Sequence, residues 1–200
     1  MNAFAKKGLV SVGLATWAAI AVFVGMTLMA GHWYTLPTPD RDDSELSSAL
    51  ASLGRERADS EWLAVHVLYA KCRCSQRIFE HLFGSERPDL AETVLLVGED
   101  ELLERRARDA GYAVVAVSPA ELKADYHMES APLLVVLDPQ DRVRYAGGYT
   151  ERKQGYDVKD REIVASLVAG DPADELPAYG CGVSKELQEV LDPLGVKYDE

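Results

Sequence analysis

The sequence contains only three cysteines, Cys72, Cys74 and Cys181, among its 200 residues. That is too few to build a disulfide scaffold, but enough for a redox pair or a small metal site. Cationic residues are also scarce, since 21 lysines and arginines stand against 33 acidic residues and give a net charge of −12. Because nucleic-acid binding requires a cationic surface, this charge argues against a nucleic-acid partner.

Internal repeats and low-complexity tracts are missing as well, and no stretch is rich in methionine or histidine. Apolar residues make up 48% of the chain and aromatic residues 8%, which are ordinary values for globular proteins and exclude wholesale disorder. The length allows one domain of usual size with some residues left over.

One uncharged apolar run, from Gly8 to Gly31, lies near the N-terminus. As a helix rising about 1.5 Å per residue, it would cover the roughly 30 Å hydrocarbon core of a bilayer. It is longer than the apolar region of a cleaved signal peptide. Lys6 and Lys7 precede it, so the positive-inside rule places the N-terminus in the cytoplasm. We therefore expect residues 1–34 to be an uncleaved transmembrane anchor, with the rest of the chain outside the cytoplasm.

The remaining residues divide into three segments. Residues 35–61 read as a proline-containing linker and a short helix, and residues 171–200 as a C-terminal extension that carries Cys181. Between them, residues 62–170 alternate in the order βαβαβαββα, with strands expected at 62–69, 92–97, 112–117, 133–137 and 143–145. This alternation predicts parallel crossovers and a closing antiparallel hairpin, and the apolar strands indicate that helices cover both faces of the sheet.

The pair Cys72-Arg73-Cys74 lies just after the first expected strand and at the start of the first helix. Backbone N–H groups at a helix N-terminus favour an anion, and Arg73 adds a positive charge nearby. We therefore expect one thiol of the pair to have a pKa below the roughly 8.5 of an ordinary cysteine. Three roles fit the pair: thiol–disulfide exchange, binding of a soft metal ion, or a structural role.

The strand, cysteine pair and helix at Ala64 to Leu82 resemble the thioredoxin superfamily. The C-x-C pair together with the glycine-flanked Cys181 is similar to what is found in small membrane-anchored thioredoxin-like proteins of bacteria. Glu129 to Leu133 is similar to the cis-proline loop of that family, and Gly147-Gly148 follows the hairpin where the family commonly has glycine. The resemblance covers about Trp62 to Gly170. It implies a three-layer α/β/α sandwich with a mixed sheet.

The resemblance also implies a cis peptide bond between Ala131 and Pro132, beside the cysteines, where a substrate strand would pair with the backbone. His66 stands six residues before Cys72, where the family often has a buried acid that exchanges protons with the second cysteine. The alternative is an idle, hydrogen-bonded histidine. The motif departs from the family in being C-x-C instead of C-x-x-C, which favours a more oxidising disulfide.

The function expected from these features is a membrane-tethered thiol–disulfide oxidoreductase in the bacterial periplasm, anchored in the inner membrane. Cys72 would be the nucleophile and Cys74 the resolving thiol, with Ala131, Pro132 and Arg73 against the substrate. Its partners would be protein disulfides or a redox protein, and it would need no cofactor.

The alternatives are a copper(I) chaperone that uses the thiolates, and an assembly factor for respiratory complexes or cytochromes. Cys181 is expected to lie close enough to Cys72 or Cys74 to exchange with one of them, because its glycine neighbours allow close backbone approach and Ser184 is a plausible N-cap of a docked helix.

Overall fold

The computed structural model describes residues 3–54, 61–84, 90–153, 155–193, 195 and 198. For residues 3–10, 28 and 30–33 it describes the backbone alone. The chain forms two compact units, Met1–Tyr34 and Thr35–Glu200.

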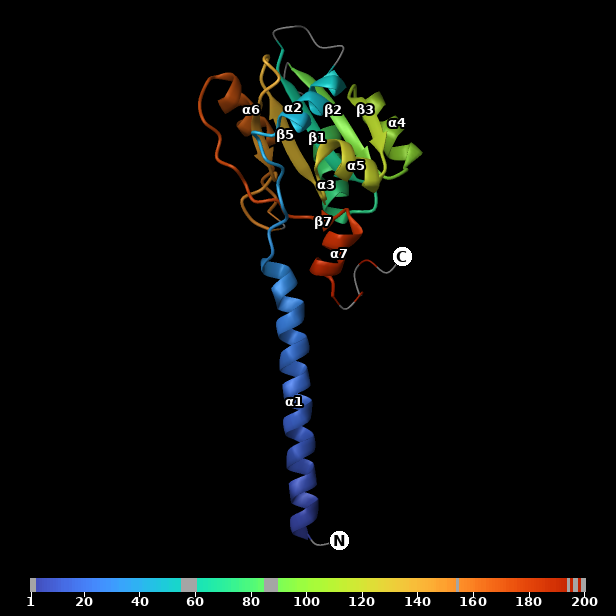
Figure 1. Cartoon of the computed structure of the whole chain (residues 1–200), viewed down its shortest axis with the longest axis vertical. Helices are drawn as coiled ribbons and strands as arrows, with labels where there is room; N and C mark the ends of the chain where they lie inside the picture. Colours follow the sequence, from blue (N-terminus) through green and yellow to red (C-terminus); the bar gives the residue numbers. More distant parts are fainter. Residues whose placement is uncertain are drawn as a thin grey trace. The chain divides into compact units, whose positions relative to one another are not determined.

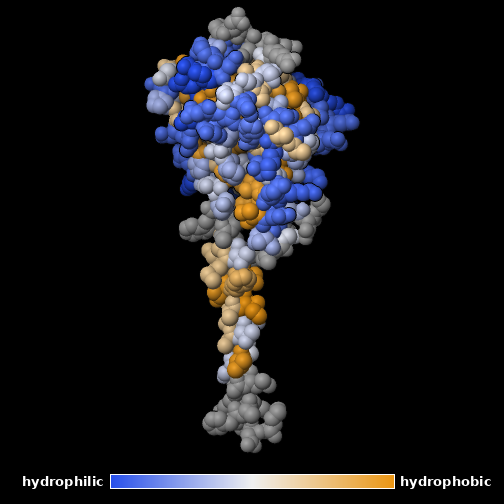
Figure 2. Space-filling model, in the orientation of Figure 1, coloured by the Kyte–Doolittle hydropathy of each residue, from blue (hydrophilic) through white to orange (hydrophobic). Residues whose placement is uncertain are grey.

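The first unit contains helix α1 (Ala3–Trp33), which covers the apolar run near the N-terminus. Its exposed large side chains are apolar, as the colours of Figure 2 show along this helix, and they include Val12, Trp17, Phe23, Met26 and Met29. Within the described part of the chain, no helix combines the length and the apolar character that crossing a membrane requires. The side chains of residues 6–10, 28 and 30–33, which belong to the predicted anchor and its flanks, lie outside the described residues.

The second unit is built on a five-stranded mixed sheet in the order β3-β2-β1-β5-β6. Its strands are β1 (Leu63–Tyr69), β2 (Ala91–Val97), β3 (Ala113–Val117), β5 (Leu133–Leu137) and β6 (Val143–Gly147). Strands β1, β2 and β3 run parallel, whereas β5 is antiparallel to both of its neighbours. The predicted parallel crossovers and closing hairpin are therefore confirmed.

Helices cover both faces of this sheet, which gives the three layers of a thioredoxin-like fold (Figure 1). Alternate β1 residues point to opposite faces: Val65 and Val67 pack with α2 (Ser44–Ala51) and α5 (Pro119–Tyr126), and Ala64 and Leu68 pack on the other side. The second face is covered by α3 (Arg73–Gly84), α4 (Glu101–Asp109) and α6 (Asp160–Val168). Polar side chains dominate the visible outer surface of this unit (Figure 2).

Local chemistry explains where these helices begin. Ser118 and Glu121 form a capping box around Pro119 at the start of α5. Asp43 accepts hydrogen bonds from the N–H groups of Glu45 and Leu46 at the start of α2. A short 3-10 turn, η1 (Ser52–Gly54), follows α2.

The segments on either side of the sandwich pack against each other. The N–H of Leu36 donates to the carbonyl of Ala178 at 2.9 Å, and that of Gly148 donates to Leu176 at 2.8 Å. A second, two-stranded sheet joins β4 (Ser130–Ala131) to β7 (Cys181–Gly182), and α7 (Lys185–Leu191) follows β7. The C-terminal extension therefore runs along the domain and returns to the loop before β5.

Candidate redox site at the cis-proline loop

Cys72 lies in the turn between β1 and α3, where its backbone links the two elements. Its N–H donates to the carbonyl of Tyr69 at 3.0 Å, and its own carbonyl accepts the N–H of Gln76 at 2.9 Å. The N–H of Ser75, in the first turn of α3, donates to the Cys72 sulfur. Although it opens a helix, Cys72 is fully buried.

Cys181, which belongs to the C-terminal extension, lies next to Cys72. The two Sγ atoms are 2.7 Å apart, and no disulfide joins the described cysteines. The prediction that Cys181 lies within exchange distance of the C-x-C pair is therefore confirmed. The role of Cys181 in a reaction stays a prediction.

The bond between Ala131 and Pro132 is cis, as predicted. Ala131 belongs to β4, and its carbonyl oxygen is 3.9 Å from the Cys72 sulfur. A substrate strand is expected to pair with the backbone beside this proline. In the structure, β7 of the same chain pairs there, with Cys181 directly opposite Ala131.

Gly180 explains how β7 comes so near. A Cβ atom added at Gly180 would lie 2.0 Å from the carbonyl oxygen of Ala131 and 2.5 Å from Cδ of Pro132, closer than any real Cβ contact. The expected close backbone approach is confirmed, and only glycine fits at this position.

Cys74 and Arg73 differ from Cys72 in being exposed. Cys72, the expected nucleophile, is therefore the less accessible thiol of the pair. The cause is the tertiary packing of β4 and β7 over the first residue of the motif, whereas Cys74, in the first turn of α3, is exposed. Cys74 also forms a side-chain hydrogen bond with Cys72, so the three thiols are in contact through Cys72.

The hydrogen bond with Cys181 raises the pKa of the Cys72 thiol above its ordinary value. Burial and the charge of Cys181 act in the same direction, whereas hydrogen bonds from Cys74 and the Ser75 N–H act against it. The expectation that one thiol of the pair has a lowered pKa is therefore not met at Cys72, where the hydrogen bond with Cys181 outweighs those from Cys74 and the Ser75 N–H.

His66 is buried on β1, but its hydrogen bonds do not reach a cysteine. Its Nδ1 is 2.9 Å from Oη of Tyr149, and its Nε2 is 3.1 Å from Oε1 of Glu92, which is also buried. The Tyr149 hydroxyl lies 3.2 Å from the carbonyl of Leu133, the residue after the cis-proline. These contacts support the alternative in which His66 is a hydrogen-bonded structural residue. They also link β1 to β2 and β5.

Sequence reasoning did not identify several side chains that complete the site. Gln188 of α7 donates from Nε2 to the carbonyl of Gly182 at 3.0 Å, and the N–H of Gly182 donates to Oη of Tyr198 at 3.0 Å. Ser75 is fully buried and accepts the N–H of Tyr69 at 3.0 Å. No sequence motif marks these residues, because each acts across a tertiary contact.

The predicted N-cap of the last helix is confirmed. Oγ of Ser184 accepts the N–H of Leu187 at 3.2 Å and also donates to the Glu129 carboxylate, which joins α7 to the loop before β4.

Among the described residues, no group of three or more histidine, cysteine, aspartate or glutamate side chains is arranged to hold a metal ion. The copper(I) alternative stays a prediction.

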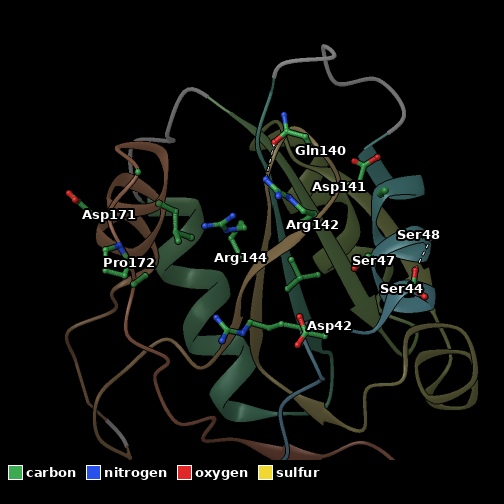
Figure 3. A pocket seen from close by; sticks show the side chains of 16 residues that line it. Asp42, Ser44, Ser47, Ser48, Gln140, Asp141, Arg142, Arg144, Asp171 and Pro172 are labelled. Carbon is green, nitrogen blue, oxygen red and sulfur yellow. Dashed lines mark hydrogen bonds between the residues drawn. The ribbon is translucent and has the colours of Figure 1, made fainter.

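A separate cavity of about 850 Å³ is lined by residues of α2, the β5–β6 hairpin and the segment that follows α6, and is drawn in Figure 3. Three arginines line it together with three aspartates: Arg41, Arg142, Arg144, Asp42, Asp141 and Asp171. Arg142 pairs with Asp138 at 2.8 Å and Arg41 with Glu175 at 2.7 Å. The cavity contains no cysteine or histidine, and its charges are compensated, so it is not the redox site.

No protein-family model matches the chain, and no curated protein matches it. Solved structures that resemble it include an uncharacterized conserved protein from Geobacillus kaustophilus, with 14% sequence identity and a TM-score of 0.48, over 62% of this chain and 77% of that one. Another is the hypothetical protein SMc02350 from Sinorhizobium meliloti 1021, with 20% identity and a TM-score of 0.45, over 75% of this chain and 89% of that one.

A third is a candidate thiol-disulfide oxidoreductase from Bacteroides vulgatus, with 12% identity and a TM-score of 0.37, over 60% of this chain and 78% of that one. The fold of the second unit is thioredoxin-like. That assignment rests on the strand order, the cysteine pair between β1 and α3, and the cis-proline before β5.

Proposed function

We propose that this protein is a thiol–disulfide oxidoreductase that reacts with protein disulfides through Cys74 and Cys72. The observation that carries the proposal is the cluster of three thiols at the cis-proline loop, centred on Cys72, whose sulfur is 2.7 Å from that of Cys181. Sulfur atoms in such contact can pass a disulfide between them with little movement of the backbone.

The exposure of the thiols supports a definite order of attack. The exposed Cys74 thiol releases its proton to water, and the resulting thiolate attacks one sulfur of a client disulfide. The client S–S bond breaks, and the departing client thiolate takes up a proton. The Cys72 thiolate then attacks the sulfur of Cys74, which breaks the mixed disulfide and releases the second client thiol. The protein loses two electrons and two protons, and the client gains both.

The membrane tether and the periplasmic location are part of the same proposal. Their support is the uncharged run from Gly8 to Gly31 with Lys6 and Lys7 before it, together with the helical backbone of α1 and its exposed apolar side chains. Alkaline carbonate extraction of cell membranes tests the tether, and protease treatment of spheroplasts tests the side on which residues 35–200 lie. Release of the full chain by carbonate would overturn the tether without affecting the redox proposal.

A single-turnover experiment tests the exchange chemistry. The reduced full-length protein in detergent is mixed with a synthetic peptide disulfide, and the products are mapped by mass spectrometry. We expect one peptide disulfide to be reduced per protein molecule. Cys72→Ser should stop the reaction at a mixed disulfide between Cys74 and the peptide, because the resolving thiol is missing.

Cys74→Ser should lower the rate to that of the uncatalysed exchange, while Ser48→Ala, an exposed change on α2, should react like the wild type. Wild-type reactivity in Cys74→Ser, or the absence of a trapped species in Cys72→Ser, would overturn the proposal. The copper content of the same sample tests the alternative. Stoichiometric copper(I) that is lost in Cys72→Ser, in a protein that does not exchange, would favour a chaperone instead.

A further inference from the structure

The edge of β4 beside the cis-proline is occupied by the protein's own C-terminal segment. Cys181 pairs with Ala131 and Gly182 with Ser130 in an antiparallel ladder. The N–H of Val183 extends this ladder by donating to the carbonyl of Glu129 at 2.7 Å. A strand added to an exposed edge through main-chain hydrogen bonds is a general way in which proteins bind extended peptides.

The segment 179–183, which we name the resident strand, has its cysteine where a bound client would need one. Its sulfur is 2.7 Å from that of Cys72, and its neighbour Gly180 touches the backbone of Ala131 and the ring of Pro132 with no space for a side chain. Contacts beyond the strand hold it in register, from Gln188 to Gly182 and from Ser184 to Glu129.

We propose that the resident strand is a built-in substrate mimic that closes the client-binding edge of β4 and accepts the disulfide from the C-x-C pair. This inference rests on the proposed function, since it concerns the fate of the disulfide formed there. It predicts that an extended polypeptide can pair with β4 only after the resident strand has moved away.

The redox step follows from the three contacting thiols. Reaction with a client leaves a disulfide between Cys72 and Cys74. The Cys181 thiol loses its proton to water, and the resulting thiolate attacks the Cys72 sulfur of this disulfide. The bond between Cys72 and Cys74 breaks, a bond between Cys72 and Cys181 forms, and the departing Cys74 thiolate takes up a proton. No net electron is gained or lost in this step. A dithiol reductant then restores all the thiols and becomes a disulfide itself.

In the oxidised form, the Cys72–Cys181 bond ties the resident strand covalently to the turn before α3, and so holds it beside β4. In the reduced form only hydrogen bonds and packing hold it, so it opens more readily. The edge of β4 therefore becomes available to a client when the protein is reduced and can donate electrons. It is closed when the protein is oxidised and cannot donate them.

The substitution Gly180→Ala tests this directly, because the new methyl group cannot fit against Ala131. Gly84→Ala is the matched control, since a Cβ there meets nothing within 4 Å. The readouts on the full-length protein are the rate of alkylation of Cys72 by iodoacetamide and the amide hydrogen exchange of Gly182 and Val183. We expect Gly180→Ala to raise both rates at least about tenfold in the reduced protein, because local opening limits the reaction of buried groups.

After treatment with the peptide disulfide, the wild type should show a Cys72–Cys181 bond and slowed exchange at Val183, and Gly180→Ala should show neither. Ser184→Ala, which removes an anchor without adding bulk, is a second variant in case Gly180→Ala does not fold, and it should give a smaller rise in the same rates.

Unchanged rates of alkylation and amide exchange in both variants would overturn the proposal that the resident strand closes the edge of β4. A wild type that never reacts with the peptide disulfide would instead overturn the proposed function, and this is observed separately because alkylation and amide exchange need no client.

Discussion

The sulfur atoms of Cys72 and Cys181 lie 2.7 Å apart although 109 positions separate the two residues in the chain. The contact exists because β7 pairs with β4 beside the cis-proline, with Cys181 opposite Ala131. As a result, Cys72 lies between the other two thiols, whose hydrogen bonds act on its pKa in opposite directions.

The first prediction concerns the pKa of Cys72. Removing the hydrogen bond and the charge of Cys181 by Cys181→Ala should lower this pKa, because they are among the causes that raise it. Cys74→Ala should raise it further, because the hydrogen bond from Cys74 acts in the opposite direction. The measurement is the pH dependence of Cys72 alkylation followed by mass spectrometry. Midpoints that move in the same direction in both variants would contradict this account.

The buried contacts of Tyr149 should contribute clearly to stability. Tyr149→Phe removes the hydroxyl that contacts His66 and Leu133, and leaves buried polar groups with one partner fewer. We expect the free energy of unfolding to fall by about 1–3 kcal/mol in urea denaturation. Tyr156→Phe is the control, because Tyr156 is 93% exposed, and its effect should stay within about 0.5 kcal/mol. Equal effects of the two substitutions would argue against the role of this network.

Stability should depend on pH through the pair of His127 and Asp43. Hydrogen bonding to Asp43 raises the pKa of His127, and the same bond lowers the pKa of Asp43. The histidine contribution is fully present below its unfolded pKa of about 6.5 and is lost as pH rises through its raised folded value. The aspartate contribution is present above about pH 3.9 and is lost as pH falls through its lowered folded value.

His127→Asn tests this pair while keeping a residue that tolerates the positive φ of 51° at this position. The wild type should exceed the variant in urea midpoint most clearly near pH 5.5, and the difference should shrink by pH 8.5. A difference that grows as pH increases would show that another interaction dominates.

Helix α2 should belong to the folded core of the domain. Leu46 and Leu50 are fully buried and pack with the face of the sheet that α5 also covers. Leu50→Ala should lower the free energy of unfolding by about 2–5 kcal/mol, as for other buried leucines. Leu102→Ala on α4, where the side chain is 61% exposed, should have a much smaller effect. Similar values for the two variants would mean that α2 contributes little to the core.

Most of the architecture can be predicted from the sequence, because it depends on local patterns. The apolar strands, the proline and capping residues at the start of α5, and the cap at Ser184 are encoded within a few residues of where they act. The cis bond at Pro132 and the cysteine pair before α3 follow from the resemblance of these segments to a known family.

Tertiary structure alone decided which thiol of the C-x-C pair is buried and which residues form hydrogen bonds with His66. Cys72 is buried and Cys74 exposed because β4 and β7 cover one side of the turn before α3, and the register of these two strands depends on how residues 171–183 pack along the domain. His66 bonds to Glu92 and Tyr149 because parallel pairing with β2 and the turn after β6 bring them to it. The sequence by itself determined which thiols are present and that Gly180 permits close approach, whereas long-range packing determined which sulfur atoms meet.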